Sequence, residues 1–313
     1  MKILVVGAGA TGGYFGGRLL EAGRTVTFLV RPARAAQLAA NGLFVQSPLG
    51  DVHVATPPTV LASALAEPYD LVIVSCKAYD LEAAAESFAP AVGPQTLVLP
   101  LLNGMQHIEM LGKRFERSQI LGGMCLISST LDADGRIVHL NQLHDLTFGQ
   151  PDGVRSAPVA AVEAEFSHAR FNAHLSDNIV SEMWAKWVLI ASGAGATCLM
   201  RGTVGDIVAA DAQQYALAIF DECSGVATAA SYPVDETSAA RIRALLTTPQ
   251  SPLTASMFRD IERGARTEED QIIGDLVRRG EHSGAPPTPL LRLVDAHLRT
   301  YEARRARETM AAG

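Results

Sequence analysis

A chain of 313 residues, 48% hydrophobic and 19% charged, is long enough for one large or two medium globular domains and does not have the composition of a disordered protein. Its net charge of −7 argues against a nucleic-acid partner. Because no run of about 18 uninterrupted apolar residues occurs, we predict a cytoplasmic protein without a membrane span or a membrane partner.

The first thirty residues predict a nucleotide-binding unit. Lys2–Val6 is a short apolar run typical of a buried parallel strand. A G-x-G-x-x-G motif follows, then a helical pattern and a second strand over Thr25–Val30. The motif alone is weak, but strand, glycines, helix and strand within about 30 residues favour dinucleotide binding over a structural turn. The predicted cofactor contacts here are Gly7, Gly9, Ala10, Thr11 and Gly12.

The end of the second strand indicates which dinucleotide is bound. NAD sites place a carboxylate there for the ribose 2′-hydroxyl, whereas 2′-phosphate sites use arginine. Here Arg31 takes that place and Arg34 is close by. A solvated arginine is the ordinary alternative, but the position favours NADPH over NADH.

Further strands follow at βα spacing. Strands over Asp70–Ser75 and Thr96–Leu99 lead into Lys77 and Asn103, which we expect at the carboxyl edge of a sheet, near cofactor or substrate. A helix-entry lysine and an Asn-Gly turn are the bland alternatives. Between these two strands we predict a helix over Leu81–Phe88. After them we predict a β-rich extension over Ile120–Ser129, Gly135–Leu140 and Leu146–Phe148, and then a helix over Val159–Phe166.

From residue 178 onward helical periodicity replaces strand patterns. We predict helices over Ile179–Leu199, Ala212–Ala230, Glu236–Leu246, Glu269–Arg279 and Leu290–Arg305. The fold class is therefore α/β, with an N-terminal Rossmann-like doubly wound sheet and an all-α C-terminal domain. We set the domains at 1–175 for the NADP(H)-binding domain and 176–313 for a helical substrate and dimerisation domain. A dehydrogenase with its site in the cleft between two such domains is the expected layout.

Cysteine and histidine give no support for a disulfide framework or a metal site. The eight histidines show no H-x-x-x-H spacing, so we predict no metal. The cysteines form no C-x-x-C pair, as suits a reducing cytosol; they are Cys76, Cys125, Cys198 and Cys223.

Lys186 is one charge near the start of an apolar helix, in WAKWVLIASGAGATCL. Glu182 lies four residues earlier, so a surface ion pair is the ordinary interpretation. A lysine at the edge of an apolar pocket is alternatively a tuned acid.

These residues resemble the ketopantoate reductase (2-dehydropantoate 2-reductase) family, over essentially the whole chain. The resemblance rests on the blocks GAGATG with Arg31, SCKAYD, LLNGM, EMWAKW, SMFRD and RTE. It implies hydride transfer from NADPH to the keto carbon of a 2-oxo acid, and pantothenate biosynthesis is the pathway associated with the family. A homodimer is a possible assembly.

The resemblance also implies roles for individual residues. Lys186 matches the catalytic lysine and Glu268 the active-site carboxylate, although Glu268 also begins a charged run typical of a solvated helix start. Asn103 matches a cleft asparagine near nicotinamide and substrate. The remaining matches are Ser256 for the substrate carboxylate, Asp260 for the acid of the S-M-x-x-D block, and Lys77 and Arg31 for cofactor contacts.

The chain departs from the family where the substrate is held. Two asparagines that grip the substrate, four and eight residues after the lysine, are Ile190 and Ala194 here, and a later asparagine is Ile273. Losing polar partners in a buried site penalises a hydroxylated substrate by about 1–3 kcal/mol per group. We therefore expect a 2-oxo acid or a related carbonyl compound with a more apolar or differently shaped tail. A β-hydroxyacid dehydrogenase and a catalytically silent NADPH sensor are the alternatives.

Overall fold

The computed structural model describes residues 1–312, which divide into two compact units. Unit 1 comprises Met1–Leu102 and His107–Val180. Unit 2 comprises Asn103–Gln106 together with the chain from Ser181 onward. A four-residue stretch from the first half of the sequence is thus packed with the helices of the second half.

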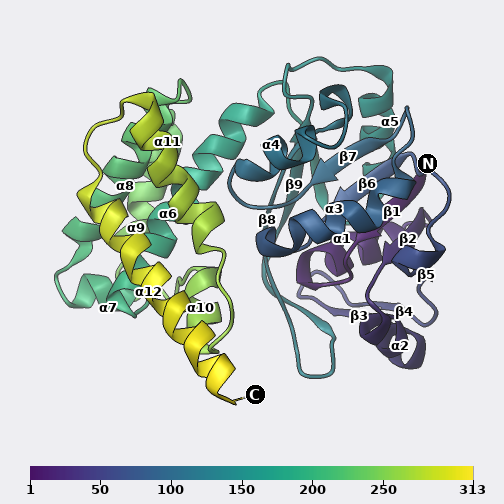
Figure 1. Ribbon diagram of the computed structural model, residues 1–313, viewed down its shortest axis with the longest axis horizontal. Coiled ribbons are helices and arrows are strands. Elements are labelled where there is room, and N and C mark those ends of the chain that lie inside the picture. Colours follow the sequence, from purple (N-terminus) through teal and green to yellow (C-terminus); the bar gives the residue numbers. More distant parts are fainter. Residues whose placement is uncertain (313) are drawn as a thin grey trace. The chain divides into compact units, whose positions relative to one another are not determined.

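The centre of unit 1 is a five-stranded parallel sheet in the order β5-β2-β1-β6-β7 (Figure 1). Chain order runs outward from β1 in both directions, so the switch point of the topology lies between β1 and β6. In open α/β sheets ligands bind beyond the carboxyl ends of the strands at that point. The strands are β1 (Lys2–Val6), β2 (Thr25–Leu29), β5 (Thr59–Val60), β6 (Leu71–Val74) and β7 (Leu97–Pro100).

Both faces of this sheet are covered, which explains why its strands are apolar throughout. Ile3 and Val5 pack into one core cluster with Phe15 of α1 (Ala10–Glu21). Leu4 and Val6 point to the other face, into a cluster with Phe88 of α3 (Leu81–Phe88). Alternation along one strand therefore anchors a helix layer on each side.

A second, mixed sheet has the order β10-β9-β3-β4, with β8 paired to β9. Its strands are β3 (Leu43–Gln46), β4 (Val52–Val54), β8 (Gly122–Leu131), β9 (Ile137–Gly149) and β10 (Asn172–Leu175). The two strand segments predicted after residue 134 form the single strand β9. Its ladder with β8 is irregular between Ile127 and Ser129, and His139 Nε2 donates to Leu143 O there at 2.9 Å. That bulge is why the sequence pattern looked interrupted.

The rest of unit 1 is made of connecting helices. They are α2 (Pro32–Asn41), α4 (Gln106–Gly112) and α5 (Ala157–Phe166). The helix α2 contains a single large apolar side chain, Leu38, which is buried.

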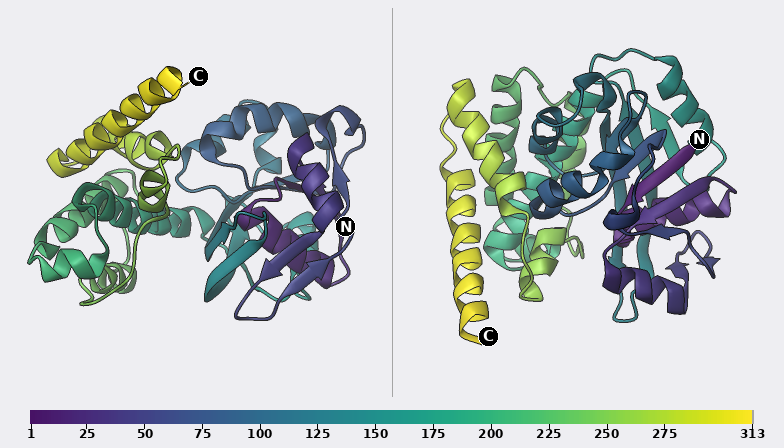
Figure 2. Two further views of the ribbon diagram at one scale, coloured as in Figure 1. Left: turned by 90° about the horizontal axis from the view of Figure 1, so that it is seen from below. Right: turned by 45° about the vertical axis from the view of Figure 1, so that its right-hand side comes forward.

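Unit 2 is helical in the part of the chain that the structure describes. Its long C-terminal helix is seen at full length in both views of Figure 2. The elements are α6 (Ile179–Met200), α7 (Val204–Ala209), α8 (Gln213–Ala229), α9 (Glu236–Leu246), α10 (Ser256–Glu262), a π-helix (Asp270–Gly274), α11 (Asp275–Ser283) and α12 (Pro289–Ala312). The predicted fold class, a parallel sheet with helices followed by a helical domain, is confirmed.

α6 is the core helix of unit 2. By length and composition it would also qualify as a membrane-spanning helix, but 61% of its apolar window is buried, as in the core of a globular fold. A Cβ at Gly195 would lie 2.9 Å from the Ile219 side chain of α8 and 3.5 Å from Val294 of α12. The small residues of α6 thus serve close helix packing.

The helix predicted over Glu269–Arg279 is confirmed, but Asp270–Gly274 in its first half is wound as a π-helix before α11. At this widened turn the Ile272 carbonyl accepts a hydrogen bond from Trp187 Nε1 of α6, at 2.9 Å. An inserted side-chain donor of this kind is a tertiary contact that periodicity does not reveal.

Candidate active site

The glycine-rich turn lies at the switch point of the parallel sheet. Gly7 follows β1 with φ +93°, and Gly9 is the N-cap of α1. A Cβ on Gly12 would collide with Ser75 Oγ and lie 2.5 Å from Gly7 O, whereas a Cβ on Gly9 would meet no atom within 4 Å. Gly12 therefore allows close packing and Gly9 leaves open space at a helix N-terminus. This cradle fits the pyrophosphate of a dinucleotide.

The two arginines after β2 have different surroundings. Arg31, the N-cap of α2, keeps 77% of its side chain exposed and pairs with Asp80, with Nη2 and Oδ2 3.2 Å apart. Arg34 donates to Ala8 O at 3.1 Å and to Gly135 O at 2.9 Å, and burial lowers its pKa. Arg34 thus ties α2 to the glycine turn and the β8–β9 hairpin, and Arg31 is the exposed cation.

The segment after β6 reaches the same switch point. Ser75 Oγ donates to Val6 O at 3.0 Å, which joins the ends of β6 and β1. Lys77 follows as the N-cap of a 3₁₀ helix, Ala78–Asp80, and is half-buried. Unit 1 therefore gathers the predicted cofactor residues Gly7, Gly9, Ala10, Thr11, Gly12 and Lys77 at the carboxyl ends of β1 and β6.

Lys186 meets Asn103 within unit 2. The Lys186 ammonium donates to Asn103 Oδ1 at 3.0 Å, and both side chains are half-buried. Gln271 of the π-helix donates from Nε2 to Asn103 O at 3.2 Å. Gly104 has φ +79°, and a Cβ there would lie 2.7 Å from Gln271 O. The Asn-Gly turn is thus held closely against the π-helix, and this fixes the acceptor of the lysine.

The π-helix is also joined to α6 directly, through the bond from Trp187 to Ile272. Glu268 O accepts from Ile272 N at 3.0 Å, so the half-buried Glu268 leads directly into this segment. Burial, and then the charges of Asp270, Asp295 and Glu302, raise the pKa of the neighbouring Glu269 to about 7, while Arg299 opposes the shift. The region around Glu268 is therefore strongly acidic and partly withdrawn from water.

One face of α6 runs from Lys186 toward α10. Lys186, Ile190, Gly193 and Thr197 are spaced four, three and four residues apart and so share that face. Ala194 stands at its edge and is buried. A Cβ at Gly193 would meet no atom within 4 Å, so this part of the face is open.

Ser256, which we predict to bind the substrate carboxylate, lies on α10 near the far end of this face. Ala255 N donates to Thr197 Oγ1 at 3.3 Å, which holds the start of α10 against α6. Ser256, the first residue of α10, is exposed, and Asp260 is half-buried on the same helix.

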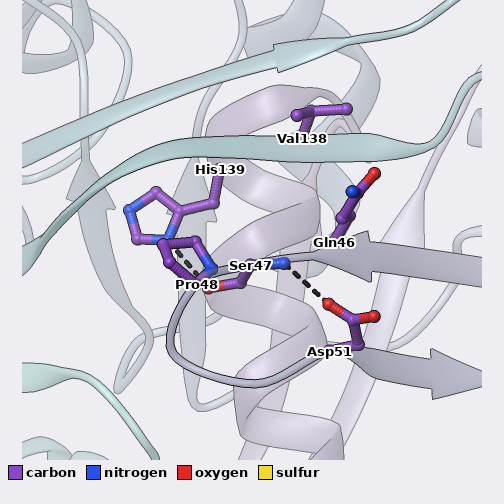
Figure 3. A pocket seen from close by; sticks show the side chains of 6 residues that line it. All are labelled: Gln46, Ser47, Pro48, Asp51, Val138 and His139. Atoms are coloured by element: carbon purple, nitrogen blue, oxygen red, sulfur yellow. Dashed lines mark hydrogen bonds between the residues drawn. The ribbon is translucent and has the colours of Figure 1, made fainter.

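A separate hollow of about 260 Å³ lies in unit 1 between β9 and the β3–β4 loop (Figure 3). Its polar groups are engaged within the fold: Ser47 Oγ bonds His139 Nδ1 at 2.9 Å, and Ser47 N donates to Asp51 Oδ1 at 2.9 Å. Since a carbonyl only accepts, His139 donates from Nε2 to Leu143 O, and Nδ1 of the neutral ring accepts from Ser47. None of the predicted site residues lines this hollow. Its hydrogen bonds hold the β3–β4 loop in place.

Sequence reasoning missed three residues that the geometry brings out. Asp80 and Gly193 lie in segments that the sequence had already singled out. The contact of Asp80 with Arg31 and the open space at Gly193 depend on tertiary structure. Gln271 lies 168 residues from Asn103 in sequence, and no local motif marks it.

The chain matches known proteins over nearly its whole length. A family model described as ketopantoate reductase PanE/ApbA matches residues 3–153, and its C-terminal counterpart matches residues 178–302. An uncharacterized oxidoreductase of Bacillus subtilis (strain 168), YkpB, is 36% identical over 304 residues, which is 97% of this chain and 99% of YkpB. A 2-dehydropantoate 2-reductase of Archaeoglobus fulgidus is 30% identical over 90% of this chain and 92% of its own. The crystal structure of a PanE/ApbA family ketopantoate reductase from Ralstonia eutropha JMP134 is 27% identical with a TM-score of 0.87, covering 98% of this chain and all of that one.

Proposed function

The chain belongs to the ketopantoate reductase family, and from this premise we propose that it is an NADPH-dependent reductase of a 2-oxo acid with Lys186 as general acid. Family and relatives make it an oxidoreductase of the 2-dehydropantoate 2-reductase type. The observation that carries the proposal is the bond from the Lys186 ammonium, on a mostly apolar helix, to Asn103 Oδ1.

Lys186 suits the chemistry of carbonyl reduction. Hydride addition to a keto carbon makes an alkoxide, which a positioned ammonium stabilises and then protonates. The bond to Asn103 uses one of the three ammonium donors and orients the amine. We assign Glu268 to orientation of the lysine, and Ser256 to the substrate carboxylate.

The face of α6 beyond the lysine supports an apolar substrate tail. Ile190 and Ala194 offer no hydrogen bond to a hydroxylated tail, and the open space at Gly193 admits a larger substituent. A buried hydroxyl without a partner costs about 1–3 kcal/mol. The preferred substrate is therefore a 2-oxo acid whose tail is apolar and bulkier than a methyl group.

The cofactor is proposed as NADPH, which supplies the hydride when it is bound. Gly7, Gly9 and Gly12 shape the pyrophosphate cradle, Ala10 and Thr11 begin the helix behind it, and Lys77 follows β6 at the same edge of the sheet. Arg31 is exposed at the position of a 2′-phosphate ligand. We assign residues 1–175 to cofactor binding and the remainder to substrate binding and dimerisation.

A cytoplasmic location is also proposed. None of the four cysteines, all of which lie within residues 1–312, forms a disulfide, and burial raises the pKa of both Cys198 and Cys223 to about 12. Thiols of that kind are inert at neutral pH and suit a reducing compartment.

The test is NADPH oxidation by the purified protein against a panel of 2-oxo acids that includes ketopantoate. We expect kcat/KM to be higher for acids with a bulky apolar tail than for ketopantoate. The double variant Ile190→Asn, Ala194→Asn should reverse that ratio in favour of ketopantoate, by about tenfold or more. NADPH binding without turnover of any member, unchanged by Lys186→Ala, would instead support a sensor. Oxidation of 3-hydroxy acids would support a β-hydroxyacid dehydrogenase.

A further inference from the structure

Asp80 stands at a helix start but does not cap it. It is the N-cap of α3, yet its carboxylate makes no capping hydrogen bond to the backbone of that helix. Instead Oδ2 lies 3.2 Å from Nη2 of Arg31, across the switch point from the end of β2. Asp80 ends a 3₁₀ helix that runs directly into α3, with φ −101° and ψ −3°, so its carboxylate is not needed as a cap and pairs with Arg31.

This ion pair bears directly on the 2′ position of a bound dinucleotide. A 2′-phosphate on Arg31 must displace Asp80 or lie beside its negative charge, and either one weakens binding. A ribose 2′-hydroxyl, in contrast, can donate to the Asp80 carboxylate, as it does to the acid of an NAD site.

Arg34 does not offer a second phosphate ligand of equal strength. Two of its nitrogens, Nε and Nη1, donate to Ala8 O and Gly135 O and hold the side chain in place, so only the buried Nη2 is left without a hydrogen bond. Discrimination at the 2′ position thus depends on Arg31 and on what competes for it.

We propose that Asp80 is a specificity-determining residue, which competes with the 2′-phosphate of NADPH for Arg31 and offers an acceptor to the 2′-hydroxyl of NADH. The preference of the protein for NADPH is therefore weaker than it would be without Asp80. The inference rests on the proposed dinucleotide-binding function and concerns which form of the cofactor is bound.

The experiment measures the dissociation constants of NADPH and NADH by fluorescence titration, without substrate. In Asp80→Asn the ratio of the NADH constant to the NADPH constant should rise by about five- to tenfold over the wild type. Because Asp80 makes no capping hydrogen bond, its replacement should leave α3 intact. Glu82→Gln is the matched control, because it removes an exposed carboxylate two residues away that is outside the ion pair; its ratio should stay at the wild-type value.

A double-variant cycle with Arg31→Gln separates competition from general repulsion. If Asp80 acts by holding Arg31, Asp80→Asn should raise NADPH affinity when Arg31 is present. In the Arg31→Gln background the same substitution should raise it by less than about twofold. An equal increase in both backgrounds, or an unchanged ratio in Asp80→Asn, would overturn the proposal. Failure of the wild type to bind either dinucleotide would overturn the proposed function, and this inference with it.

Discussion

The two candidate sites of this molecule are built in different ways. In unit 1, six consecutive residues after β1 form the glycine turn, and backbone atoms at a helix N-terminus provide its binding surface. In unit 2, Lys186 is positioned by a chain of side-chain contacts through Asn103 to Gln271, from three segments far apart in sequence. The first site depends on the absence of side chains at its glycines, and the second on side chains that hold Lys186 in place. We therefore expect added side-chain atoms to impair the site in unit 1, and removed side-chain groups to impair the site in unit 2.

The largest expected effect is in unit 2, at the lysine. Lys186→Ala removes the ammonium that stabilises and protonates the alkoxide, so kcat should fall by about 10²–10⁴-fold while the NADPH dissociation constant changes little. Steady-state kinetics and fluorescence titration measure the two quantities. Lys113→Ala, at an exposed lysine of unit 1, is the control. Retention of more than a tenth of the turnover would exclude Lys186 as the general acid.

In unit 1 the largest effect should come from adding one methyl group. Gly12→Ala places a Cβ against Ser75 Oγ and Gly7 O, and should lower the free energy of unfolding by about 1–3 kcal/mol. At Gly9→Ala the same methyl group meets open space, so stability should change by less than about 0.5 kcal/mol while dinucleotide binding weakens. Urea denaturation and cofactor titration of both variants test the contrast. Equal destabilisation would contradict the different roles assigned to the two glycines.

Gln271→Met sharpens the comparison, because it keeps the volume of the side chain and removes the donor to Asn103 O. One such hydrogen bond contributes about 1 kcal/mol, so kcat should fall by about fivefold. If Gln271 acts through Lys186, the basic limb of the pH–rate profile should also move, which a merely structural role would not cause. A normal pH profile and kcat in Gln271→Met would show that Asn103 is held by other contacts.

The smallest effect should be the pH dependence of stability at Glu269. Its pKa is about 7 in the folded protein against 4.5 ordinarily, chiefly because of burial, so the folded state holds the proton that the unfolded state releases. Stability should therefore fall as pH rises from about 4.5 to about 7, and the penalty should remain above pH 7. After allowance for solvent screening, Glu269→Gln should be about 1 kcal/mol more stable than the wild type at pH 8 and equal to it at pH 4.

Urea denaturation at the two pH values measures that difference. Glu236→Gln, at an exposed carboxylate in the first turn of α9, is the control and should give the same small change at both. A gain in Glu269→Gln that is as large at pH 4 as at pH 8 would mean that the effect does not come from titration.

The sequence by itself determined the elements whose physical cause is local. The apolar run of β1, the glycines and the helix α1 follow one another along the chain, and α3 and α9 have the predicted bounds because their periodicity and flanking residues lie within the helices themselves. The likeness to a reductase family was also readable from short blocks of sequence, and the family models bear it out.

Only the tertiary structure decided how the side chains of those blocks are used. Arg31 and Arg34 are equivalent in sequence, yet one is exposed beside Asp80 and the other is committed to two backbone carbonyls. The π-helix at Asp270–Gly274 exists where Trp187 supplies a donor from another helix. Lys186 acquires its partner because Gly104, with φ +79°, lets a turn from the first half of the chain pack against Gln271. Contacts between distant segments leave no periodicity behind them, so they become visible only when the chain is folded.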